Sequence, residues 1–544
     1  MADAMKWWQR ALIYEVCTPV FQDSTGDGLG DLPGVERRLD YLEWLGVDAI
    51  WLTPFHPSPM TDLGYDIVDH TAVAPQAGTL DDFTRLIEKI HRRGMRLILD
   101  LVPNHTSDQH PWFIESAASR TSAKRRWYIW ADPAPGGGPP NNWQSDLGGP
   151  AWIWHAPTGQ YYYHAFARDQ PDLNWREPAV REAVFDVMRF WLDRGVDGFR
   201  VDVLWHLAKD VRLRDNPPNP DFNPSVNSPR QAILQVYSAD QPDVHEIVAE
   251  LRGVIDEYDD RLLIGEVYLP VSDLVRYYGT QRSEVHLPFN FQLVQTAWDA
   301  PHLRRVVDEY EASVAAGEWP NWVLGNHDQP RVASRIGREQ ARVAAALLLT
   351  LRGTPTLYYG DEIGMQNGAI PREKMRDERA RSCDGKGIGR DPFRTPMQWD
   401  GSRFAGFSTR EPWASLAPDH ATVNVAAEVE DADSMLSLYR RLIRLRRDSP
   451  ALITGDYQPV DVRGPVFAYL RTLGEEAFLV ALNLSDLPRS IALPPGVGTG
   501  RVVLSTRDHR ERRATGDTVI ELRADEGLVI QLDRPPAPRS STMV

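Results

Sequence analysis

The sequence is poor in cysteine. Its 544 residues include two, Cys17 and Cys383, and neither stands in a metal-binding spacing. A disulfide framework is therefore not expected, and nothing demands an oxidising compartment. Residues 1–10 lack the apolar core of a signal peptide, and no apolar run approaches the length of a membrane span. These absences predict a soluble, cytoplasmic protein with no membrane partner.

Positive charge is also scarce. The chain has 60 Lys and Arg against 76 Asp and Glu, a net charge of −16 that is spread along the chain. This balance argues against nucleic acid as a partner. Aromatic residues are abundant, with 18 Trp and 18 Tyr. Their faces suit sugar rings, although large cores use them too.

Short apolar segments alternate with helical segments from the N-terminus to about residue 450. Alternating strands and helices indicate a parallel sheet, and eight strands fit a closed (β/α)8 TIM barrel. The expected strands are 8–16, 47–53, 96–102, 196–203, 262–267, 284–288, 321–325 and 355–359.

Two connections are too long to be plain loops. Residues 106–172 predict an inserted subdomain after strand 3, and residues 206–245 are expected to lie over the top of the barrel. Short strands separated by turns predict an all-β C-terminal domain of sandwich type. The expected domains are the barrel (1–105 and 173–450), the inserted subdomain (106–172), the β-sandwich (451–535) and a flexible tail (536–544).

Four short motifs fall at the carboxyl ends of expected strands, where barrel enzymes place their active sites. They are residues 100–105, 198–202, 265–268 and 326–328. Each alone is compatible with a strand followed by a turn, but together they predict an active site. Within 198–202, alternation puts Arg200 and Asp202 on one face. The Arg would lower the pKa of the carboxyl and keep it ionised, as a nucleophile requires; a structural ion pair is the alternative.

With these motifs in place, the chain resembles the α-amylase superfamily, glycoside hydrolase family 13, over nearly all its length. Residues 46–54 and 353–362 resemble the second and eighth strand segments of that family. Residues 170–174, 394–399 and 23–31 are similar to segments of its oligo-1,6-glucosidase and α-glucosidase branch.

The resemblance implies a retaining mechanism that uses two carboxyl groups. Asp202 would be the nucleophile and Glu266 the acid/base, with a raised pKa. Asp328 would bind sugar hydroxyls and stabilise the oxocarbenium-like state. His105 and His327 would hydrogen-bond sugar hydroxyls; a satisfied core histidine is the alternative for each.

The resemblance also places Asp62 and Tyr65 in a glucose pocket, although Asp62 could be a turn residue. Asp62 would pair with Arg394 and close the far end of the pocket, which gives exo action. Phe166 and Gln170 would line the same pocket.

Residues 23–31 offer oxygens at alternating positions, as calcium loops do. Thr25 stands where the branch usually has Asn, and Gly34 stands where an EF-hand has its bidentate Glu. A structural Ca2+ or Mg2+ is expected, with an empty turn as the alternative and no organic cofactor. The expected ligands are Asp23, Thr25, Asp27, the carbonyl of Leu29, and Asp31.

The sequence does not decide which type of glycosidic bond would be cleaved. Val203, next to the nucleophile, accompanies α-1,6 cleavage in this branch, although it could be an ordinary strand residue. Residues 206–245 instead resemble α-glucosidases that take short α-1,4 substrates.

The sequence predicts a retaining exo-α-glucosidase that releases terminal non-reducing glucose from maltose- or isomaltose-type oligosaccharides through a covalent glucosyl-enzyme. One alternative is a transglycosylase or isomerase related to sucrose or trehalose conversion. A distant alternative is a non-catalytic, transporter-associated barrel protein, which would lack the carboxylates. The sequence does not decide whether the protein is a monomer or a homodimer.

Overall fold

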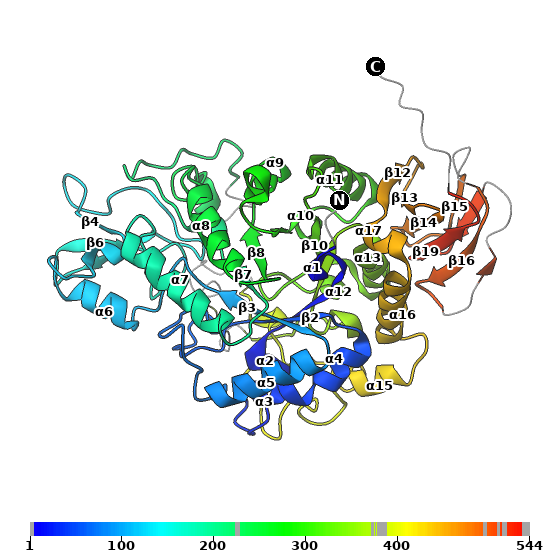
Figure 1. The fold of residues 1–544 in the computed structure, drawn as a ribbon, viewed down its shortest axis with the longest axis horizontal. Helices are drawn as coiled ribbons and strands as arrows, with labels where there is room; N and C mark the ends of the chain where they lie inside the picture. The colour runs from blue at the N-terminus through cyan, green and yellow to red at the C-terminus, as the bar shows by residue number, and fades with distance from the viewer. Residues whose placement is uncertain are drawn as a thin grey trace, which may run out of the picture.

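The computed structural model describes most of the chain (Figure 1). The described residues are 5–223, 229–371, 375, 377, 389–492, 498–508, 512–513 and 519–535. The expected tail 536–544 and Cys383 lie outside them.

Eight parallel strands form the central sheet, which confirms the predicted barrel. Their order is β10-β11-β1-β2-β3-β7-β8-β9, and the two end strands contact each other, so the sheet curves round on itself. The strands are β1 (Ile13–Val16), β2 (Ala49–Leu52), β3 (Arg96–Leu101), β7 (Gly198–Val201), β8 (Leu262–Val267), β9 (Leu287–Asn290), β10 (Asn321–Val323) and β11 (Thr354–Tyr358).

Two strand starts differ from the prediction by three residues or more, and the other strand bounds differ by at most two residues. The first strand begins at Ile13 and not at Trp8, because Trp7–Arg10 forms the short helix α1. Trp8 is buried there against apolar residues of the barrel interior, which explains an aromatic run that looked like strand. The sixth strand, β9, begins at Leu287, three residues later than expected.

Amphipathic helices surround the barrel (Figure 1). In α5 (Leu80–Arg92), Phe83, Leu86, Ile87 and Ile90 are buried, which is the spacing of a single helix face. Its first turn is closed by a reciprocal capping box between Thr79 and Asp82. The other main helices are α3 (Leu32–Arg37), α4 (Leu39–Leu45), α7 (Pro178–Leu192), α8 (Val244–Asp256), α11 (Ala300–Ser313), α13 (Arg338–Thr350) and α16 (Met435–Asp448).

A subdomain is inserted between β3 and α7, as predicted. It contains α6 (Pro111–Ala118) and an antiparallel sheet of β4 (Trp130–Ala131), β6 (Gln160–Tyr163) and β5 (Trp152–His155). Trp143 and Trp152 are buried in its own small core. Part of the tryptophan content therefore serves packing.

The C-terminal region is all-β, with two antiparallel sheets. A six-stranded sheet has the order β12-β13-β14-β19-β16-β17, and β15 (Arg489–Ala492) pairs with β18 (Val519–Leu522). Along β13, Phe467 and Tyr469 join the barrel core, while Val466, Ala468 and Leu470 pack in the cluster shared with β15 and β18. Alternation thus buries both faces. The six strands are β12 (Asp456–Val460), β13 (Val466–Leu473), β14 (Glu476–Asn483), β16 (Gly500–Ser505), β17 (Arg512–Arg513) and β19 (Gly527–Leu532).

The residue-level domain boundaries given above stay a prediction. Within the described residues, no helix has both the length and the apolar character to cross a membrane.

Candidate active site

Strand β7 places Arg200 and Asp202 at the centre of the barrel. Gly198 allows this, because a Cβ there would lie 2.3 Å from the carbonyl oxygen of Leu262 on β8. Arg200 is fully buried, and its Nη1 donates to Asp202 Oδ1 at 2.7 Å and to Asp100 Oδ1 at 2.7 Å. The two residues expected to share a face therefore do so.

The same guanidinium also holds Glu266, at the end of β8. Its Nη2 lies 2.8 Å from Glu266 Oε2, and the backbone N–H of Val203 donates to that oxygen at 2.7 Å. One arginine thus joins Asp202 and Glu266 as neighbours, and retaining glycosidases likewise use a close pair of carboxyl groups.

Burial dominates the electrostatics of this pair. It raises the pKa of Glu266 to about 7, against the opposing charge of Arg200. It also raises the pKa of Asp202 above its usual range, although Arg200 again opposes the change. The prediction that Arg200 would lower the pKa of Asp202 considered only the ion pair and left out desolvation. The two carboxyls titrate together and retain a proton near neutral pH.

Asp328 has the opposite environment. Burial disfavours its charge, but His327, Arg390 and Arg394 outweigh burial and hold the pKa of Asp328 well below its usual range. Arg394 Nη2 donates to Asp328 Oδ1 at 2.6 Å, and Arg390 Nη1 donates to the same oxygen at 3.0 Å. The Asp328 side chain is 23% exposed, against 8% for Asp202 and 2% for Glu266. The cluster therefore opens toward solvent at Asp328.

Asp62 is joined to the cluster through the same two arginines that bind Asp328. Its Oδ1 accepts from Arg390 Nη2 at 2.5 Å and from Arg394 Nη1 at 3.4 Å, and its Oδ2 accepts from Gln170 Nε2 at 3.3 Å. The structure thus brings together the expected Asp62 and Arg394. It adds Arg390 as the nearer partner.

Tyr65 and His327 stack on each other inside the cluster. Their ring centroids are 5.0 Å apart with an interplanar angle of 16°. Tyr65 donates its hydroxyl to Asp100 Oδ2 at 2.7 Å, and His327 Nδ1 lies 2.6 Å from Glu15 Oε1 on β1. The contacts with Asp100 and Glu15 therefore fix the rotamers of both rings.

His105 and Phe166 lie beside the same cluster. Their ring centroids are 5.5 Å apart, and Phe166 also contacts His206. His105 Nε2 lies 3.2 Å from the Tyr65 carbonyl oxygen, and its Nδ1 lies 3.2 Å from Asn104 Nδ2. Burial lowers the pKa of His105, so the ring is neutral.

Val203 has a strained backbone. Its φ of 41° lies in the left-handed region, which is unusual for a β-branched residue. This conformation presents the Val203 N–H to Glu266, as described above, and so the strain is located at the candidate acid/base.

The expected cation loop is closed by hydrogen bonds. Asp23 Oδ1 accepts from the Gly26 N–H and Oδ2 from the Gly28 N–H, while Asp31 caps α3 through the Gly34 N–H. Asp27 accepts from the Leu29 N–H. No set of three His, Cys, Asp or Glu side chains in the described part of the chain is placed to hold a metal ion. The carboxylates of Asp23, Asp27 and Asp31 therefore do not form a metal site by themselves.

Sequence reasoning missed Glu15 and Arg390 and left Asp100 without a role. Glu15 stands in an ordinary strand pattern, which carries no signal. Arg390 precedes the 394–399 segment by four residues and could have been proposed as a second cation beside Arg394. Asp377 was also missed; it accepts from Arg390 Nη2 at 2.9 Å.

Comparisons with known proteins show which family the chain resembles. A family model described as the alpha amylase catalytic domain matches residues 15–455. An alpha-glucosidase of Culex pipiens is 39% identical, with 90% of this chain and 84% of that protein covered. An oligo-1,6-glucosidase of Parageobacillus thermoglucosidasius is 36% identical, with 97% and 99% covered.

Solved structures are also similar. An alpha-glucosyl transfer enzyme has a TM-score of 0.92 at 38% identity, with 97% of this chain and 100% of that chain covered. The trehalulose synthase of Pseudomonas mesoacidophila has a TM-score of 0.90 at 34% identity, with the same coverage.

Proposed function

This chain belongs to the alpha-amylase family and is a glycoside hydrolase, and we propose that it is a retaining exo-α-glucosidase. The substrates would be short oligosaccharides that end in non-reducing, α-linked glucose, of maltose or isomaltose type. One observation carries the proposal: a single buried guanidinium, Arg200, holds both Asp202 and Glu266 at hydrogen-bonding distance.

The reaction follows from the proton held by this pair. Asp202 attacks the anomeric carbon while Glu266 gives its proton to the glycosidic oxygen, and the bond between that carbon and oxygen breaks. Glu266 then takes a proton from water, whose oxygen attacks the anomeric carbon and displaces Asp202. Burial supports the first role of Glu266, because a pKa of about 7 keeps it protonated in mildly acidic solution.

Exo action would follow if one end of the sugar site is blocked. Arg390 and Arg394 join Asp62 to Asp328, and the buried side chains of Asp62, Arg390 and Arg394 would block that end. Asp328, ionised by the same arginines, would bind sugar hydroxyls and stabilise positive charge at the anomeric carbon. The neutral rings of His105 and His327, with Tyr65, Phe166 and Gln170, would line the sugar site.

The stereochemistry tests the mechanism. Proton NMR during the first turnovers should detect α-glucose before mutarotation; β-glucose as the first product would contradict it. Asp202→Asn should abolish turnover, while Asp197→Asn, which alters an ion-pairing carboxylate at the start of the same strand, should keep it.

Glucosyl transfer is the second candidate function. It is favoured by the likeness to an alpha-glucosyl transfer enzyme and to a trehalulose synthase. A panel of maltose, isomaltose, sucrose and trehalose separates the two candidates. Free glucose as the main product supports hydrolysis, and isomerised or lengthened sugars without free glucose support transfer.

Val203 would influence which bond is cleaved. Its side chain is 7% exposed beside Asp202 and Glu266, and it would contact the sugar that leaves. In the same panel, Val203→Thr should change the ratio of isomaltose to maltose cleavage if this role is correct.

Three further expectations stay proposals. A structural Ca2+ or Mg2+ in the loop 23–31 is supported by its oxygen spacing alone, and an unchanged melting temperature in EDTA would contradict it. The cytoplasmic location and the choice between monomer and homodimer await fractionation and light scattering.

A further inference from the structure

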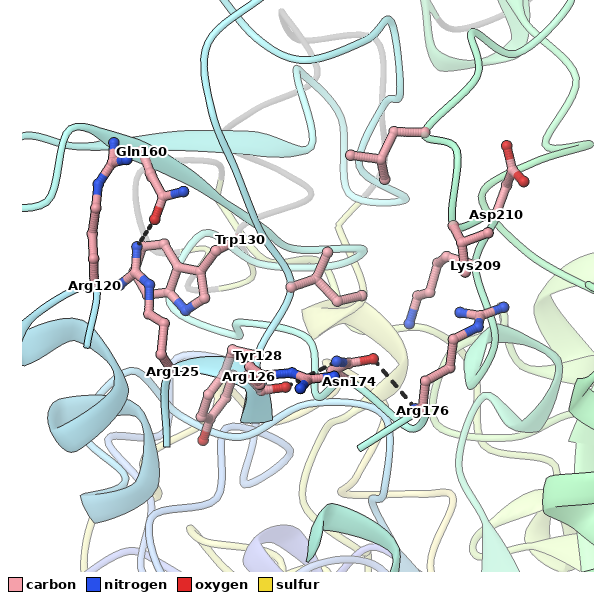
Figure 2. A pocket seen from close by; sticks show the side chains of 13 residues that line it. Arg120, Arg125, Arg126, Tyr128, Trp130, Gln160, Asn174, Arg176, Lys209 and Asp210 are labelled. Carbon is pink, nitrogen blue, oxygen red and sulfur yellow. Dashed lines mark hydrogen bonds between the residues drawn. The ribbon is translucent and has the colours of Figure 1, made fainter. Parts of the chain in front are cut away.

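A cavity of about 600 Å3 lies between the inserted subdomain and the segment after β7, and cations dominate its lining. In a chain of net charge −16, this concentration of positive charge is unusual. Figure 2 shows Arg120 and Arg125 on one side and Arg176 and Lys209 on the other. The charged lining residues are Arg120, Arg125, Arg126, Arg176, Lys209 and Asp210.

The carboxylate in this lining is already engaged. Asp210 accepts from Arg214 Nε at 2.8 Å, and this charge pair lowers the pKa of Asp210 to about 2. Lys209 is likewise committed, since its Nζ lies 2.5 Å from Asp172 Oδ2. The charge available to a ligand therefore comes from the arginines.

The outer arginines form ion pairs near the surface. Arg120 lies 3.0 Å from Asp132, and these side chains are 50% and 67% exposed. Arg126 is 84% exposed and lies 3.3 Å from Glu177, whose side chain is 20% exposed, and Arg176 pairs with Asp243. Ion pairs with at least one solvent-exposed member contribute little and are readily exchanged for another anion.

Arg125 is the uncompensated charge. It is 8% exposed, and its hydrogen bonds go to the neutral acceptors Ser116 O, Thr158 Oγ1 and Gln160 Oε1. Its guanidinium lies 3.5 Å above the Trp130 ring, and it has no ion pair with any residue that the structure describes. Burial lowers the pKa of Arg125 to about 10. Buried charges in proteins are normally paired, so an anionic ligand would stabilise the Arg125 guanidinium.

We propose that this cavity binds a phosphate group, as inorganic phosphate or as a sugar phosphate. Several guanidinium groups line one cavity, and their planar donor pairs match phosphate oxygens. More than one arginine favours a dianion over a single carboxylate. The cavity volume lies in the usual range for small-molecule sites. This inference goes beyond the proposed hydrolysis and does not depend on it.

Titration calorimetry on the full chain tests the proposal, with inorganic phosphate as the probe at constant ionic strength. We expect binding at one site per chain, weakened about tenfold by Arg126→Gln, which removes one charge-assisted contact. Arg125→Gln should abolish it. Arg305→Gln, an equally conservative change of an exposed arginine on α11, should leave it unchanged.

Binding of glucose 1-phosphate, measured in the same way, distinguishes a sugar phosphate from inorganic phosphate as the ligand. Glucose 1-phosphate that binds much more tightly than phosphate identifies a sugar phosphate; equal affinity identifies the free anion. No phosphate binding, equal binding by acetate, or equal affinity in wild type and Arg126→Gln would overturn the proposal. Arg126→Gln keeps the test valid if Arg125→Gln fails to fold. Its glucosidase activity should be unchanged, so this result is independent of the proposed function.

Discussion

Replacing Glu15 by Gln should leave hydrolysis nearly unchanged, whereas replacing it by Leu should lower it. Glu15 is fully buried on β1, and its Oε1 lies 2.6 Å from His327 Nδ1. Its other oxygen, Oε2, has no hydrogen-bond partner among the described residues. The outcome depends on which of the two groups carries the proton.

Burial determines the protonation states of Glu15 and His327. It raises the pKa of Glu15 well above its usual range despite the opposing charge of Arg200, and it lowers the pKa of His327 well below its usual range. Burial thus favours the neutral form of both groups. In that form we expect the Glu15 hydroxyl, whose oxygen also accepts from the His327 backbone N–H, to donate to His327 Nδ1. The ring then carries its own proton on Nε2, which lies 3.4 Å from Asp328 Oδ2.

The magnitudes follow from this assignment. A Gln amide N–H can also donate to Nδ1, so Glu15→Gln should keep kcat/KM within about threefold of wild type. Leu leaves Nδ1 of His327 buried and unpaired, which costs about 1–3 kcal/mol. If the transition state bears that cost, kcat/KM falls roughly 5- to 150-fold.

The assay is hydrolysis of p-nitrophenyl α-glucoside from pH 5 to pH 8, with the His327 tautomer read by 15N NMR. Glu362→Gln is the matched control, because Glu362 is equally buried but accepts from Tyr14 and Tyr41. If kcat/KM falls as far in Glu15→Gln as in Glu15→Leu, then Glu15 is ionised and the reasoning from burial is wrong.

Three other predictions follow from the charged groups. As the proposed acid, Glu266 would have to be protonated to act, so kcat/KM should fall as the pH rises through about 7, the pKa to which burial raises it; a profile that stays flat to pH 9 would contradict this. Arg390→Gln leaves Asp328 and Asp62 with Arg394 alone, and losing one member of a buried ion network costs about 3–5 kcal/mol. We therefore expect kcat/KM to fall by two orders of magnitude or more, with partial recovery in Arg390→Lys; a change below threefold would remove Arg390 from the site. Burial, together with Glu362, raises the pKa of Glu428 to about 7. This carboxyl therefore adds stability at low pH that is lost as the pH rises from about 4.5 to 7, roughly 2–3 kcal/mol. Between pH 5 and pH 8, urea unfolding should show a loss of stability that is smaller by this amount in Glu428→Gln than in wild type.

Local patterns predicted the strands that carry the site, and long-range contacts decided the rest. Period-2 alternation correctly put Arg200 and Asp202 on one face, because Asp202 directly follows the short strand that carries Arg200. The contact between Glu15 and His327 joins residues 312 positions apart, and no local pattern encodes it. The raised pKa of Asp202 has the same origin, since desolvation depends on the whole barrel and not on the neighbouring residue.

The division of arginines among the carboxylates explains how one pocket can hold both an acid and a fixed negative charge. Arg390 and Arg394 both donate to Asp328, and they keep it ionised in spite of burial. Arg200 is instead shared by Asp100, Asp202 and Glu266, and a single positive charge does not offset the desolvation of three carboxyls. Asp202 and Glu266 therefore retain a proton near neutral pH. Environments that push neighbouring pKa values apart in this way assign the acid and the charge stabiliser. A second cation near Arg200 would remove the proton, and with it the acid that the reaction needs.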